Sequence, residues 1–87
     1  MISKSYTVTD ARQIVVAADD QNRTVYLQII GNSTVYLGGA DVSDSNGIPV
    51  AKHEAFHEIF VPIKQTVYAV CASGVTETLR VLLPALD

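Results

Sequence analysis

Tryptophan is absent from this chain of 87 residues, and cysteine occurs once, as Cys71. A single cysteine excludes an internal disulfide, and its place in an apolar run with Ala69 and Val70 favours a small buried hydrophobe over a reactive thiol. Charge is also scarce, because charged residues make up 17% of the chain against roughly 25% in typical soluble domains. Interface cores are depleted in charge, so this composition suits a surface that neighbouring subunits partly cover.

The sequence has neither a basic patch nor a long apolar run. Its six cations stand singly and its net charge is -3, whereas nucleic-acid binding needs clustered cations to neutralise phosphates. The first twelve residues lack the apolar stretch of a signal peptide, and no apolar run has the length of a membrane span. We therefore expect no nucleic-acid partner, no membrane partner and a protein that is made and kept in a cytoplasm.

What the chain does contain is the tripeptide Thr-Val-Tyr, at 24–26, 34–36 and 66–68. β-Branched and aromatic residues in alternation are typical of strands, with Val on one face and Thr and Tyr on the other. The valine face is predicted to be core. Alternation and turn residues predict strands near 4–9, 13–18, 23–30, 34–38, 55–61, 66–72 and 76–83.

Short loops between these strands exclude the long crossovers that parallel pairing requires. The prediction is therefore an all-β fold, a single small antiparallel β-sandwich or barrel of about seven strands, with residues 1–87 as one domain. Gly31, Asn32 and Ser33 predict a hairpin that places Leu27 and Ile29 opposite Leu37 and Val35. The longest irregular stretch, 39–50, is the predicted functional loop.

One stretch matches a catalytic motif. His53, Glu54 and His57 fit HExxH, and Glu77 lies where a third zinc ligand could follow. That spacing works only on a helix, whereas the surrounding sequence predicts a strand. The turn residues at 41–47 also fail as a calcium loop, because Asp and Glu are missing from its first and twelfth positions. We expect no catalytic site, no metal and no cofactor, and a zinc hydrolase is the least favoured function.

A family resemblance is carried by the run from Thr34 to Val42, the turn from Asn46 to Val50 and the later strand from Tyr68 to Gly74. This pattern resembles small β-structured virion proteins of tailed bacteriophages, above all the capsid decoration or cement proteins. The resemblance implies a virion structural protein, made in the host cytoplasm, that assembles as a homotrimer on the capsid surface. It also implies that the chain binds the outer face of the phage head and stabilises contacts of the major capsid protein.

Tyrosine supplies large contact area at low entropic cost, so the tyrosines and the functional loop are candidate contact sites. The alternative that tyrosines instead cover the second half of the core stays open. A receptor- or glycan-binding module of a phage fibre or tail is a further alternative, using exposed aromatics and loop carboxylates, although the lack of Trp argues against sugar stacking. The candidate contact residues are Tyr26, Tyr36, Tyr68, Asp41, Asp44, Asn46 and Pro49.

Overall fold

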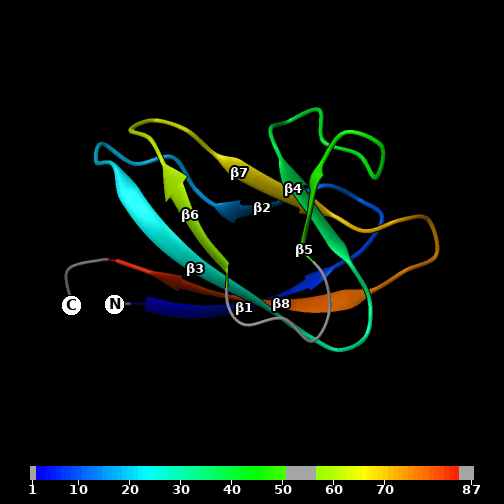
Figure 1. Ribbon diagram of the computed structural model, residues 1–87. Helices are drawn as coiled ribbons and strands as arrows, with labels where there is room; N and C mark the ends of the chain where they lie inside the picture. The colour runs from blue at the N-terminus through cyan, green and yellow to red at the C-terminus, as the bar shows by residue number, and fades with distance from the viewer. Residues whose placement is uncertain (1, 51–56, 85–87) are drawn as a thin grey trace.

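The structure is a computed structural model that describes residues 2–50 and 57–84. Within these residues it consists of two four-stranded antiparallel sheets packed as layers (Figure 1). The same residues include no helix that could cross a membrane. Sheet A contains, in spatial order, β1 (Ile2–Val8), β8 (Glu77–Leu83), β3 (Arg23–Ile30) and β6 (His57–Val61). Sheet B contains β2 (Gln13–Val16), β7 (Val67–Val70), β4 (Val35–Gly38) and β5 (Ile48–Val50).

The strand pairing is nested along the chain. The first strand pairs with the last, β1 with β8, and the same rule gives β2 with β7, β3 with β6 and β4 with β5. Two further pairings, β3 with β8 and β4 with β7, join these strand pairs into the two sheets. This is the jelly-roll arrangement of the β-sandwich. The predicted all-β antiparallel sandwich is confirmed, with one strand more than the sequence predicts.

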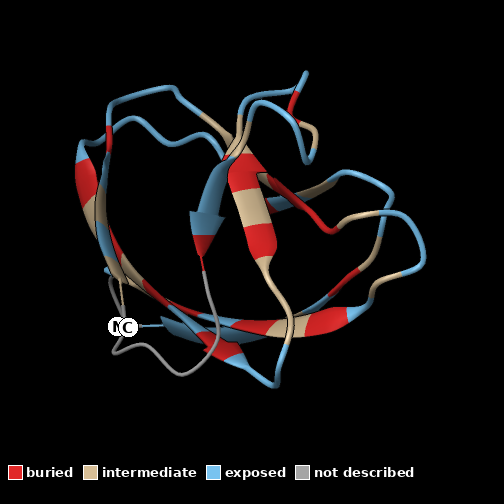
Figure 2. Cartoon of the chain, turned by 45° about the vertical axis from the view of Figure 1, so that its right-hand side comes forward, coloured by how far each residue is buried: buried red, intermediate tan, exposed pale blue. Residues whose placement is uncertain are grey.

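The core lies between the two sheets and follows the predicted alternation. Along β3 every second residue is buried, and Figure 2 shows the same banding on other strands. The valines of the three tripeptides all belong to this inner side. Val25 and Val35 are fully buried, and Val67 packs against the core cluster. The predicted valine face is therefore confirmed as core.

The predicted hairpin between β3 and β4 is wrong, because these strands belong to different sheets. Leu27 pairs with Val81 of β8 and not with Leu37. The turn between the strands is tied to β8, where the buried Glu77 carboxylate accepts a hydrogen bond from the Ser33 N–H at 2.7 Å. Gly31 has φ 143°, and a Cβ on it would collide with that carboxylate. This contact directs the chain across the edge of the sandwich into sheet B.

The opposite end of the sandwich is held by one buried cation. The guanidinium of Arg23 donates to three backbone carbonyls, those of Ala17 at 2.6 Å, Gln21 at 3.2 Å and Gln65 at 3.2 Å. These acceptors lie in the β2–β3 and β6–β7 loops. Arg23 therefore fastens two loops that are far apart in the sequence.

Candidate functional site

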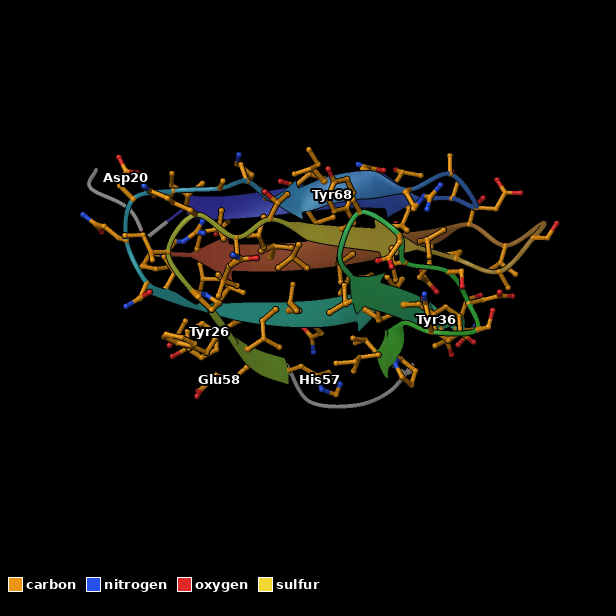
Figure 3. All side chains as sticks on the ribbon, turned by 90° about the horizontal axis from the view of Figure 1, so that it is seen from above. Asp20, Tyr26, Tyr36, His57, Glu58 and Tyr68 are labelled. Carbon is orange, nitrogen blue, oxygen red and sulfur yellow. The ribbon has the colours of Figure 1, made fainter. Side chains whose placement is uncertain are left out.

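The three tyrosines do not share one surface. Each points away from the core, as alternation predicts, but Tyr26 lies on the outer face of sheet A, whereas Tyr36 and Tyr68 lie on that of sheet B. Figure 3 shows Tyr26 beside Glu58, its partner on β6, with the other two tyrosines elsewhere on the molecule. The tyrosines thus divide between two surfaces, one on each sheet.

The outer face of sheet B is partly covered by the chain itself. Val42, in the predicted functional loop, is buried outside the main core cluster. A Cβ added to Gly38 would lie 2.8 Å from Val42 Cγ2, and one added to Gly47 would lie 2.6 Å from Tyr36 Cβ. The loop is thus folded back on β4 with Val42 wedged between two glycines. Tyr36 takes part in this packing, so for Tyr36 the alternative of a second core is supported.

The side chain of Asn46 stabilises the loop through hydrogen bonds to its backbone. It accepts from the Ser43 N–H at 2.7 Å and donates to the Asp41 carbonyl at 3.2 Å. Asp41 and Asp44 have exposed side chains. Pro49 lies opposite Tyr36 on β5, a strand within the stretch 39–50 that the sequence predicts to be a loop. A contact role for these residues stays a prediction.

The outer face of sheet A carries apolar side chains on three of its strands. Leu82 and Tyr26 lie side by side on β8 and β3, and Phe60 on β6, next along that face, is 62% exposed. Uncharged polar side chains of Ser, Thr and Gln occupy many of the other outward positions, as is usual for a solvated sheet face. Among the described residues, the charges on this face are limited to Arg80 and Glu58. We name this surface the open face.

The open face is hollowed over β1, β8 and β3. The hollow has a volume of about 740 Å³, within the size range of small-molecule sites. It offers a guanidinium, an amide, two hydroxyls and an aromatic ring, all able to bind polar or ring-shaped groups. Sequence reasoning missed it because its lining comes from three strands that only the sheet order brings together. The outward-pointing side chains that line it are Ser3, Ser5, Tyr26, Gln28, Arg80 and Leu82.

The HExxH match, which the surrounding sequence disfavours as a zinc site, is not assembled from the residues that the structure describes. His57 begins strand β6, whereas the motif requires a helix through both histidines. His53 and Glu54 lie outside the described residues. Glu77, the suggested third ligand, is buried under the β3–β4 turn and bound to backbone N–H groups. In the described part of the chain, no group of three His, Cys, Asp or Glu side chains is placed to hold a metal.

Cys71 is a buried residue, as the sequence predicts. Its side chain is 2% exposed, and its thiol donates to the Val8 carbonyl at 3.4 Å. Burial, and then the nearby Glu77 carboxylate, raise the pKa of the thiol above 9.0. Because the thiolate is the reactive form, this cysteine is a poor nucleophile and a poor disulfide partner in the folded chain.

Comparison with known proteins finds similarity at the level of structure. No family model and no curated protein matches the chain. A solved structure from Bacillus endospore appendages, described as "a novel family of disulfide-linked pili", superimposes with a TM-score of 0.62 at 18% identity. The superposition covers 99% of this chain and 85% of that chain. This likeness establishes a shared small β fold, and the comparisons add no support for the phage resemblance.

Proposed function

We propose that this chain is a structural subunit that assembles with further copies of itself and carries no catalytic site. The observation that carries the proposal is the open face, where Leu82, Tyr26 and Phe60 lie on three strands of one sheet surface. Interface cores are enriched in aromatic residues and depleted in charge. The pilus described for the structural neighbour supports self-assembly as a use of this fold.

The assembly would be held by non-covalent contacts. The neighbour's pili are disulfide-linked, but Cys71 is the one cysteine in this sequence and it is buried. A reducing agent should therefore leave the assembly of this chain intact.

Substitutions on the two outer faces test the proposal. Phe60→Ser removes the most exposed aromatic ring of the open face, and we expect it to lower the average mass measured by light scattering. Ile14→Ser is the matched control, because Ile14 is 46% exposed on the outer side of sheet B, and it should leave the mass unchanged. Circular dichroism checks that both variants fold. An unchanged mass for Phe60→Ser would show that the open face is not a contact between subunits.

A capsid surface is the setting that the sequence resemblance adds to this proposal, with the major capsid protein as a second partner. Jelly-roll sandwiches recur in viral capsid domains, which supports it at the level of fold only. An antibody against the chain, applied to phage particles and to cell-surface appendages of the source organism, separates two settings. Labelling of phage heads would support decoration, and labelling of appendages alone would contradict it.

Glycan binding is the second candidate, and the hollow on the open face is the observation that favours it. Jelly rolls also occur in lectins, and Tyr26, Gln28 and Arg80 supply a ring and polar groups on one surface. The exposed carboxylates Asp41 and Asp44 belong to the loop on the other sheet and do not join this site. Binding on a glycan array that Gln28→Ala abolishes would support the second candidate. Absence of binding would leave assembly as the function of this face.

A further inference from the structure

Each sheet ends in two edge strands, and three of the four carry features that hinder further pairing. β2 has four residues and a register shift between Ile14 and Val16. β5 has three residues and contains Pro49, and β6 is followed directly by Pro62. Short length, bulges and prolines are among the devices by which proteins protect sheet edges from pairing with other chains, and charged side chains are another.

The fourth edge, β1, has none of these three features and carries a single charge, Lys4. It is seven residues long and pairs with β8 at every position from Ile2 to Val8 without a shift. It contains neither Pro nor Gly, and four of its first residues in succession, from Ile2 to Ser5, are exposed. One side of its backbone is used by β8, so the other side presents N–H and C=O groups to the surroundings. An exposed and regular edge of this kind is a template for another strand.

The side chains of β1 suit a second β1 running in the opposite direction. Ser3, Ser5 and Thr7 point to the outer face, whereas Lys4 and Tyr6 point toward sheet B. A two-fold axis at Ser5 sets Ser3 opposite Thr7 and Lys4 opposite Tyr6 of the other copy. These are a hydroxyl pair and a cation–aromatic pair, both favourable across strands. Moving the axis to Lys4 would set two like charges opposite each other, which is destabilising.

We propose that a second copy of this chain pairs with β1 in antiparallel orientation, with the two Ser5 residues facing each other across a two-fold axis. The inference rests on the proposed self-assembly and adds a second contact, at the β1 edge of sheet A, to the one proposed at the open face. It joins two A sheets into one continuous sheet, because an even register keeps outer residues beside outer residues. A two-fold contact builds assemblies with an even number of subunits, in place of the trimer that the phage resemblance implies.

Engineered cysteines test the register directly. The native Cys71 is buried, so the introduced thiol is the one that can react. Directly opposite residues in antiparallel strands have Cα atoms about 4.5–5.5 Å apart, within the range of a disulfide. Ser5→Cys should therefore form a covalent dimer under mild oxidation. Ser3→Cys is the matched control on the same strand and face, where the two copies would be more than about 13 Å apart.

We expect at least about tenfold more covalent dimer from Ser5→Cys than from Ser3→Cys. Neither Ser3→Cys nor Thr7→Cys should cross-link alone, but an equal mixture of the two should. Cross-linking that is equal for Ser5→Cys and Ser3→Cys would overturn the register. If the native chain assembles and Ser5→Cys does not cross-link, the β1 contact is wrong and self-assembly stands. A native chain that stays monomeric would overturn self-assembly and this contact together.

Discussion

Two charged side chains are buried at opposite ends of the sandwich, and backbone groups satisfy both of them. Arg23 and Glu77 are each 7% exposed. Arg23 donates to loop carbonyls, and Glu77 accepts from the N–H groups of Ser33 and Thr78 at 2.7 and 2.8 Å. A buried charge is costly unless it is hydrogen-bonded. Each of these side chains can therefore stay buried only while the backbone groups of the neighbouring turns remain in hydrogen-bonding position. These two residues thus fix where the chain turns.

A glycine supports the loop that covers sheet B. A Cβ at Gly47 would lie 2.6 Å from Tyr36 Cβ, an atom too near the backbone to move away. Gly47→Ala should therefore lower the free energy of unfolding by about 1–3 kcal/mol, measured by urea denaturation. At Gly39 the nearest atom to an added Cβ is Asp41 Oδ1 at 3.5 Å, so Gly39→Ala should leave stability nearly unchanged. Equal effects of the two substitutions would contradict the packing described for Val42 and Tyr36.

The buried thiol predicts a pH dependence of stability. Burial raises the pKa of Cys71 above 9.0 in the folded chain, so above that pH the unfolded chain releases the proton first. The free energy of unfolding should therefore fall as the pH rises above 9, and be unaffected by this group at lower pH. Cys71→Ala removes this group, so the native chain should lose more stability than the variant between pH 8 and 10.5. Parallel curves would show that the thiol is not buried.

At the scale of elements, alternation predicted most strands well but not their partners. The inner and outer sides of β3 and β4 follow directly from the Thr-Val-Tyr tripeptides. Their assignment to different sheets depends on Glu77, which is 44 residues from Ser33 and which no local pattern connects with that turn. β5 escaped prediction because it is three residues long and contains a proline.

The candidate surfaces show the same division. Alternation gave the outward direction of each tyrosine, but only the sheet order shows that Tyr26 is separated from Tyr36 and Tyr68. The hollow and the β1 edge depend on which strands are neighbours. Period-2 patterns contain no information on that order, so a single sequence could not predict these surfaces.

Two loops are predicted to loosen together when one side chain is changed. Arg23→Gln removes the buried cation that joins the β2–β3 and β6–β7 loops. We expect a loss of about 1.5–3 kcal/mol in the free energy of unfolding and faster amide hydrogen exchange in both loops. Arg80→Gln is the control, because Arg80 is exposed on the open face, and it should change stability by less than about 0.5 kcal/mol. Faster exchange in only one of the two loops would contradict the conclusion that Arg23 holds both.

For the whole molecule, the contrast between the two outer faces is the feature that connects structure with function. Sheet B carries its own loop, with Val42 buried on it, whereas sheet A presents the open face and the regular edge of β1. A domain of this size buries only roughly 60–65% of its unfolded surface, so the proposed association of subunits would add stability. That association would use both surfaces of sheet A.

The mass of the purified chain in solution tests self-assembly most directly. Sedimentation equilibrium over a wide range of concentrations, with reducing agent present, measures it without any substitution. Self-assembly through two-fold contacts predicts a mass that rises with concentration to an even multiple of the 9.4 kDa chain. A mass that stays at 9.4 kDa at every concentration would contradict it.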